Sequence, residues 1–400
     1  MTDAGIRLTK PGTRHLTLIA ALLAMSGPFS IDTYLPSFPD IETAFGTDRS
    51  ALLHSLGVYL TATAVSTLFW GPLADRLGRR LVVLISMSFY TLGSIGCAVS
   101  NTIETFLLFR VIQGLSASGG FIAGRAMIRD AHDAESAHHA MSQVMLLFAL
   151  APAAAPVLGG WLHDYLGWRS VFWFLAMFGA FLTVMGYFIS ETLVREKRQS
   201  IHPAAVLRVY VSAIMHRDFL ALAICLSLSF GGLFLYIAGA PTVIYNFLEL
   251  GSTDFGWLFI PIVAGLMLGA LISGRLSHRW PPRLTITAAM LVMLLASLIN
   301  IGAVYFYPAN TLTVIGPLVV YVTGLSVMMP AITVMALDCL PSHRGTAASV
   351  QGFLQMVTNA CIASLALPLL DSNWSGYVLG QVLFFVLAAV LWYRFRQTHT

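Results

Sequence analysis

Charged residues are scarce in this chain of 400 residues. Asp, Glu, Lys and Arg make up 10% of the sequence, whereas 57% is hydrophobic and the mean hydropathy is +0.79. Soluble domains carry about 25% charged residues, so this shortage excludes an ordinary soluble protein and predicts an all-α integral membrane protein. The net charge of +4 gives no sign of nucleic-acid binding.

Cysteine is also rare. The sequence contains no CxxC pair and no His/Cys cluster, so we expect no metal site. A GxxxxGK[ST] phosphate loop is missing, which argues against ATP as an energy source, and we expect no cofactor. The four cysteines, predicted to be small core residues, are Cys97, Cys225, Cys339 and Cys361.

Long apolar runs recur along the whole chain. About 20 apolar residues are enough for a helix to cross a bilayer core of roughly 30 Å. Twelve such runs are present, at 15–38, 51–72, 81–99, 103–127, 139–162, 169–190, 218–246, 253–274, 284–306, 312–337, 346–370 and 374–393.

The longest polar stretch divides these runs into two predicted bundles of six helices. The bundles cover 1–190 and 217–400, and the linker between them, 191–216, contains a predicted amphipathic helix at 203–215.

The two halves share a weak internal repeat. Phe29 and Pro36 match Phe234 and Pro241 at an offset of 205 residues. Parallel repeats around an axis along the membrane normal place a binding site between the halves, near mid-depth.

Lysine and arginine are distributed unevenly between the loops. Nineteen of the 22 lie in the terminal segments and in every second loop, whereas the other loops hold only Arg49 and Arg169. Cytoplasmic loops are enriched in these residues, so we expect a multi-pass protein of a bacterial inner membrane with both termini in the cytoplasm. The remaining base, Arg110, lies within the fourth span, and Asp32 is the only acid far from a membrane edge.

Several motifs resemble those of one transporter family. GPLADRLGRR at 71–80 matches the signature between spans 2 and 3 of the major facilitator superfamily, and RVIQGLSASGG at 110–120 is similar to its span 4 motif. APVLGGWL at 155–162 resembles the span 5 motif of its drug:proton antiporters, with an alanine in place of one glycine. IDTYLP at 31–36 and RGTAASVQGFLQ at 344–355 resemble the Bcr/CflA drug-resistance branch.

The resemblance implies two pseudo-symmetric six-helix bundles and a proton-coupled multidrug efflux antiporter. Its partners would be protons, membrane lipid and small drug-like molecules, such as bicyclomycin- or chloramphenicol-like antibiotics, and we expect a monomer. Three alternatives stay open: a dedicated exporter of one metabolite, such as a siderophore or amino acid; a proton-coupled uptake carrier; and an intramembrane enzyme or receptor. Against the last, the sequence shows no nucleophile–base set and no large soluble domain.

Asp32 and Arg110 are the predicted proton-coupling pair. A charge at mid-membrane costs around 2.5–3.5 kcal/mol by insertion scales, so such residues usually face an interior or a wet cavity. Desolvation and a nearby guanidinium would act on Asp32 in opposite directions. A structural ion pair or a wetted helix-end acid is the alternative interpretation.

The 71–80 motif is predicted to form a conformational latch. Gly71 and Gly78 would bracket a tight turn, and Asp75 would pair with Arg129 and face a helix N-terminus. A solvated turn acid is the alternative. The remaining predicted members of the latch are Arg76 and Arg79.

Proline and glycine in span 5 predict a hinge with close backbone approach, at Pro152, Pro156, Gly159 and Gly160. Ordinary use of these residues in membrane helices is the alternative.

Amide, aromatic and thioether side chains are suited to varied ligands. The predicted substrate cavity, in which each residue could instead serve helix packing, consists of Tyr34, Tyr59, Gln113, Phe121, Phe234, Tyr236 and Met328.

Overall fold

The computed structural model describes residues 10–194, 198, 203–341, 344–370 and 373–398. In this described part the protein is helical, with twelve helices long and apolar enough to cross a membrane. The prediction of an all-α membrane protein with twelve spans is therefore confirmed. The predicted linker lies partly outside the described residues, and the exact domain boundaries stay a prediction.

The first half of the chain forms one group of helices. After α1 (Lys10–Asp32) come two short segments, the 3-10 helix η1 (Leu35–Ser37) and α2 (Phe38–Phe45). The other long helices of this half are α3 (Arg49–Leu77), α4 (Arg79–Val99), α5 (Ile103–Ala131), α6 (Ala134–Leu166) and α7 (Trp168–Phe188).

The second half begins after the predicted linker helix, which the structure confirms as α8 (Pro203–Met215). Its long helices are α9 (Arg217–Ala238), α10 (Gly256–Leu276), α11 (Pro282–Phe306), α12 (Thr311–Asp338), α13 (Arg344–Cys361) and α15 (Trp374–Thr398). Its short segments are η3 (Thr242–Phe247), η4 (Ser252–Phe255), η6 (Ile362–Ala366) and α14 (Leu367–Leu370), of which η3 and η6 are π-helical.

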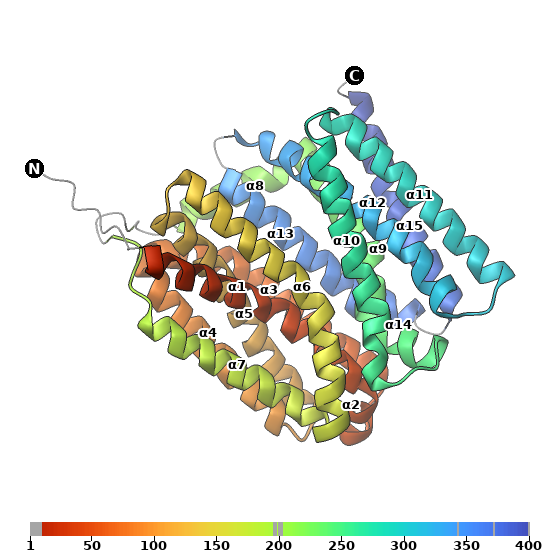
Figure 1. Cartoon of the computed structure of the whole chain (residues 1–400), viewed down its shortest axis with the longest axis horizontal. Helices are drawn as coiled ribbons and strands as arrows, with labels where there is room; N and C mark the ends of the chain where they lie inside the picture. Colours follow the sequence, from red (N-terminus) through yellow and green to blue (C-terminus); the bar gives the residue numbers. More distant parts are fainter. Residues whose placement is uncertain (1–9, 195–197, 199–202, 342–343, 371–372, 399–400) are drawn as a thin grey trace, which may run out of the picture.

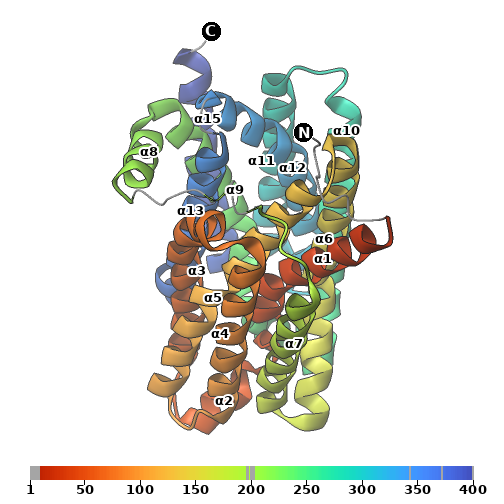
Figure 2. The same cartoon turned by 90° about the vertical axis from the view of Figure 1, so that its left-hand side faces the viewer.

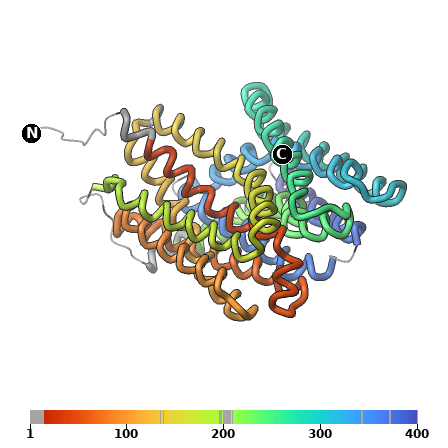
Figure 3. Tube along the Cα trace, turned by 60° about the horizontal axis from the view of Figure 1, so that its bottom comes forward, coloured from red at the N-terminus to blue at the C-terminus, as the bar shows by residue number. Residues whose placement is uncertain are grey.

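The two groups lie side by side (Figures 1 and 3). They meet where α3 packs against α13 and η6, and where α6 packs against α10 and η4. Figure 2 shows α2 at one end of the molecule and α8 at the other. We call these the α2 end and the arginine-rich end, since the loops at the second end carry most of the arginines.

Polar residues begin several of the long helices. The side chains of Asp48, Thr102 and Asp133 each accept a hydrogen bond from a backbone N–H in the first turn of α3, α5 and α6. An uncapped N-terminus leaves backbone donors unsatisfied. These caps therefore start the three helices at defined residues.

Two predicted spans are interrupted. The run at 15–38 was expected to be one helix, but α1 ends at Asp32 and η1 follows. The run at 218–246 breaks in the same way, since α9 ends at Ala238 and η3 follows. Pro36 and Pro241, which lack a backbone N–H, lie just after the two breaks. Their offset of 205 residues matches the sequence repeat.

The cysteines were predicted to be small core residues, which is correct for Cys97 and Cys225. Cys339 is half-buried, and Cys361 is exposed on α13. An apolar run in a membrane protein has one face toward the protein core and one face away from it. The sequence alone did not show on which of these faces each cysteine lies.

The linker helix α8 also contacts the first half. The Tyr210 hydroxyl donates a hydrogen bond to the Leu68 carbonyl of α3, at 3.0 Å. Burial raises the pKa of Tyr210, which keeps this donor protonated.

Candidate functional site

Arg110 lies on α5 and is completely buried. Its guanidinium carbon is 4.5 Å from the ring centre of Tyr34 and 4.4 Å from that of Tyr59. Nη1 donates to the Ser30 carbonyl at 3.0 Å and to Gln113 Oε1 at 2.6 Å. Cation–π contacts stabilise a cation most where water is excluded, so two aromatic faces and two oxygens balance the charge.

A hydrogen-bond network extends from this arginine to α4. Gln113 Nε2 donates to Ser94 Oγ at 2.8 Å. The hydroxyls of Ser30 and Tyr90 are 2.7 Å apart. The network ties α1, α4 and α5 together around Arg110. Two guanidinium nitrogens, Nε and Nη2, have no partner among the described residues.

Asp32 is the last residue of α1 and is 4% exposed. Its Oδ1 is buried without a hydrogen-bond partner in the described structure. A helix C-terminus carries a partial negative charge, and burial penalises an ionised carboxylate. Both effects make the charged form of this acid costly unless a proton, a cation or water reaches it.

The sequence places Asp32 and Arg110 together, but in the described structure they form no ion pair within 4 Å. The alternative interpretation, a structural ion pair, is therefore not supported in this conformation, and the proton-coupling role of the two residues stays a prediction. Tyr34, Tyr59 and Gln113 surround the guanidinium instead.

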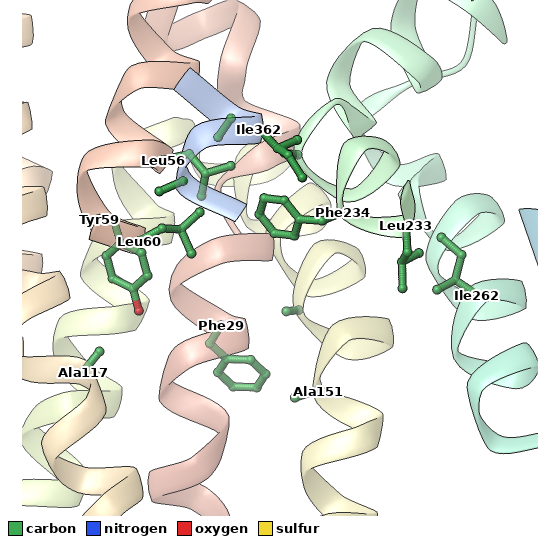
Figure 4. Close-up of a cluster of buried hydrophobic side chains, with 14 of the residues drawn as sticks. Phe29, Leu56, Tyr59, Leu60, Ala117, Ala151, Leu233, Phe234, Ile262 and Ile362 are labelled. Atoms are coloured by element: carbon green, nitrogen blue, oxygen red, sulfur yellow. The ribbon is translucent and has the colours of Figure 1, made fainter. Parts of the chain in front are cut away.

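The predicted cavity residues fall into separate places. Three of them surround Arg110, as described above. Phe121 of α5 lies 6.1 Å from Phe148 of α6, ring centre to ring centre. Met328 is fully buried in α12. Phe234 of α9 lies at the junction of the halves, near Leu60 and Ile362 (Figure 4).

Tyr236 belongs to a buried cluster of neutral polar side chains in the second half. Asn300 Nδ2 donates to Tyr236 Oη at 3.0 Å and to Gln381 Oε1 at 2.7 Å. No acid or base of the second half is buried among the described residues. Because all predicted cavity residues except Phe121 are buried, their contact with substrate stays a prediction.

The structure also contains a groove of about 430 Å³ between α1 and α6. Thr17, Leu18, Gln143, Leu146 and Leu147 line it. Thr17 is fifteen residues from Asp32, which is about 22 Å along a helix. The groove is therefore separate from the predicted site.

The predicted latch has different partners from those expected. Asp75 Oδ1 is 2.6 Å from Arg79 Nη1, and Arg79 Nε is 3.0 Å from Asp130 Oδ2. Arg129 is exposed and makes no ion pair in the described part of the chain. The predicted Asp75–Arg129 pair is not formed in the described structure. Asp75, in the last turn of α3, instead meets Arg79, the first residue of α4, across the turn at Gly78. Arg76 is exposed.

The predicted turn between Gly71 and Gly78 is shorter than expected. Gly71 lies inside α3, so only Gly78 forms the turn. Gly78 has φ of +103°, a conformation that other residues adopt only with strain.

Sequence reasoning missed Glu191, which follows the last helix of the first half. Its Oε1 accepts from the backbone N–H of Arg79 at 2.9 Å, and Oε2 accepts from that of Arg80 at 3.3 Å. The carboxylate thus caps the N-terminus of α4, which is the helix-end role predicted for Asp75. Its position as an acid directly after an apolar run was the available signal.

Asp75→Asn tests the latch. Asp75 is half-exposed and Asp130 still holds Arg79, so we expect a stability change below about 1 kcal/mol. Transport should slow, because the substitution shifts the balance between conformations. Counterflow and thermal unfolding in detergent would separate the two effects, with Asp130→Asn as the matched control. Transport at the parent rate under several gradients would exclude the latch role.

Span 5 is observed as α6, which continues through Pro152 and Pro156 and bends along its length (Figure 1). A Cβ at Gly159 would overlap the carbonyl of Thr33, which directly follows α1, and one at Gly160 would overlap the Ser252 carbonyl of η4. Close backbone approach is therefore confirmed at both glycines. A hinge motion stays a prediction.

Gly159→Ala should destabilise the protein. Its added methyl group would push α1 away from α6 just beyond Asp32, and overpacking of this kind costs about 1–3 kcal/mol. Gly27→Ala is the matched control on α1, because a Cβ there meets nothing within 4 Å. Thermal unfolding in detergent should show a lower Tm for Gly159→Ala only. Equal stability of the two variants would contradict the close packing.

Comparison with known proteins identifies the family of this chain. The family model described as Major Facilitator Superfamily matches residues 19–364. The chain is 25% identical to "Multidrug resistance protein D" of Escherichia coli (strain K12), with 94% of this chain and 95% of that protein covered. It is also 25% identical to a "Bicyclomycin resistance protein homolog" of Haemophilus influenzae, with 87% of each covered.

Solved structures agree on the fold. A bacterial homolog of the human lysosomal transporter Spinster, crystallised in an inward-facing and unoccupied conformation, superposes with a TM-score of 0.72 at 15% identity, covering 98% of each chain. The human organic anion transporter MFSD10 gives 0.69 at 18% identity, with 96% of this chain and 99% of that chain covered. From the family match, the twelve spans and this shared architecture, the chain belongs to the major facilitator superfamily, a family of membrane transporters of small molecules and not of enzymes.

Proposed function

We propose that this transporter is a proton-coupled multidrug efflux antiporter of the Bcr/CflA branch. The observation that carries the proposal is Asp32, a buried carboxylate with an unsatisfied oxygen and no ion-pair partner within 4 Å in the described structure. A buried acid of this kind gains most from binding a proton. The names of the relatives, which include bicyclomycin and multidrug resistance proteins, support small antibiotics as substrates.

Coupling follows from competition at one site. If proton and drug both bind near Asp32, each weakens the binding of the other by the same factor. A proton arriving from outside then releases drug there, and a drug arriving from inside displaces the proton. A guanidinium group is not deprotonated in proteins, so we assign to Arg110 the local field and not the transfer of the proton.

The bundles 1–190 and 217–400 would alternate between two arrangements. We place the arginine-rich end and both termini in the cytoplasm of a bacterial inner membrane, as the positive-inside rule predicts. The α2 end, where η1 and α6 meet η3 and η4, is then the closed outer side. Asp75 and Arg79 would stabilise one of the two arrangements. Pro152 and Pro156 would allow α6 to bend when the bundles change from one arrangement to the other.

The test is flux driven by a pH gradient in proteoliposomes across a panel of compounds. Several unrelated antibiotics should accumulate against their gradients, each with proton movement in the opposite direction. Movement of one metabolite alone would indicate a dedicated exporter instead. Protons that move together with the compound would overturn antiport.

A further inference from the structure

Polar contacts between the two halves gather at the α2 end. The Tyr245 hydroxyl of η3 donates to the Pro36 carbonyl of η1 at 2.6 Å. Arg49 Nη1 of α3 donates to Thr242 Oγ1 of η3 at 2.9 Å. Because these contacts are short and directional, they specify one arrangement of the halves more strictly than apolar packing does.

Arg49 is held from both sides. Its Nε lies 2.9 Å from Glu42 Oε1 of α2, and each of the two side chains is 21% exposed. The guanidinium therefore joins the short helix α2 of the first half to η3 of the second half. A partly buried arginine with two fixed partners loses little additional freedom when it makes the second contact.

The second-half side of these contacts is unusual. Both Thr242 and Tyr245 belong to η3, a π-helical segment that directly follows the break after α9. π-helical turns are rare and occur frequently at functional sites. At this place the π-helix presents two side chains, three residues apart, to the first half.

The first-half partners of these contacts lie close in sequence to the proposed proton site. Pro36 follows Asp32 by four positions, and η1 and α2 continue to Glu42. Tyr34, between Asp32 and Pro36, stacks on Arg110. A movement of the chain at Asp32 would therefore reach the Tyr245 and Arg49 contacts through about ten residues of η1 and α2.

We propose that η3 is a clasp that closes the α2 end, with Tyr245 and Arg49 as its two positioning residues. The clasp holds the segment that follows Asp32, so it must release when the α2 end opens. Leu60, Phe234 and Ile362, which come from both halves, belong to one cluster of buried hydrophobic side chains (Figure 4). The proposal rests on the proposed function in one respect, since it requires that the halves alternate.

The experiment measures the two conformations by labelling one cysteine with a membrane-impermeant maleimide. Gly27→Cys supplies the thiol, because a Cβ there meets nothing within 4 Å. The background carries Cys361→Ser, which removes the exposed native thiol. Thr43→Cys, on the exposed surface of α2, identifies the membrane side on which the α2 end lies. Intact cells and inverted vesicles give access to the two sides.

Two conservative variants remove the contacts one at a time. Tyr245→Phe loses the hydrogen bond to Pro36, and Thr242→Val loses the hydrogen bond from Arg49. Each should raise Gly27→Cys labelling from the α2 side about two- to ten-fold. Labelling from the arginine-rich side should fall in the same variants, because the two conformations exclude each other. Unfolding would instead raise labelling from both sides.

Matched controls remove similar bonds within one half. Tyr321→Phe loses a hydroxyl bond of 2.9 Å to the Ser229 carbonyl, and Thr323→Val loses one of 2.8 Å to the Val319 carbonyl. Neither should change the ratio of labelling from the two sides. If Tyr245→Phe and Thr242→Val keep the parent ratio, or if the controls shift it equally, the clasp is refuted.

The labelling needs neither substrate nor a proton gradient. A shifted ratio in the clasp variants therefore supports the clasp even if the flux assay shows that the protein is not a drug antiporter. Conversely, antiport with an unchanged ratio would refute the clasp alone.

Discussion

Asp32→Asn is expected to abolish accumulation of substrate driven by a pH gradient. The asparagine amide is nearly isosteric with the protonated carboxyl group of Asp32, but it cannot release a proton. An inward proton gains about 2.3 kcal/mol per 100 mV of membrane potential, which drives roughly a forty-fold gradient of a neutral solute at unit stoichiometry. The variant should lose this gradient entirely. Exchange of labelled for unlabelled substrate should continue, because it needs no proton.

The decisive measurement is substrate-evoked proton release from detergent-solubilised protein at several pH values. The parent should release protons when substrate binds, and Asp32→Asn should release none. Asp338→Asn is the matched control: this acid lies at the end of α12, is half-exposed, and pairs with Arg344 at 2.6 Å. Undiminished release in Asp32→Asn would show that another group carries the proton, and Asp338 would be the next candidate.

Arg110→Ala should damage folding, binding and coupling together. The substitution leaves a cavity between the rings of Tyr34 and Tyr59 and removes the donor to Gln113 and to the Ser30 carbonyl. The cavity and the two buried acceptors left without this donor together cost about 3–5 kcal/mol. We expect low expression and no detectable substrate binding.

Arg110→Lys separates charge from shape. A lysine keeps the positive charge but has no planar guanidinium to stack between two rings. If only the positive charge of Arg110 matters, the Arg110→Lys variant should bind and exchange substrate nearly as the parent does. We expect instead at least a ten-fold weaker affinity in equilibrium binding, with expression restored relative to Arg110→Ala. Parent-like affinity in both variants would exclude Arg110 from the site.

The sequence predicted the number of spans, the linker helix and the two buried charges, because each depends on composition or on one unusual residue. It did not predict the breaks after Asp32 and Ala238, because an apolar run looks the same whether its helix is continuous or interrupted. Pro36 and Pro241 were the local signals.

Side-chain partners were less predictable. The sequence assigns Asp75 to the distant Arg129, whereas the turn at Gly78 brings Arg79, the first residue of α4, within reach of it. The sequence indicated a buried Arg110, but it did not indicate that the guanidinium stacks on two tyrosines. Glu191 was recognisable as an acid directly after an apolar run, but its partners, more than a hundred residues away at the start of α4, depend on the packing of α4 against α7.

The neutral cluster of Tyr236, Asn300 and Gln381 bears on how such a protein could evolve. Asp32 and Arg110, a buried acid and a buried base, belong to the first half, and the second half offers amide and phenol groups at its described buried positions. Substitutions among neutral groups change shape and hydrogen bonding without moving a charge. Under the proposed mechanism, the second half would be free to diversify toward new compounds while Asp32 of the first half keeps the proton coupling. A chimera with a relative's second half should inherit that relative's substrates and retain proton coupling.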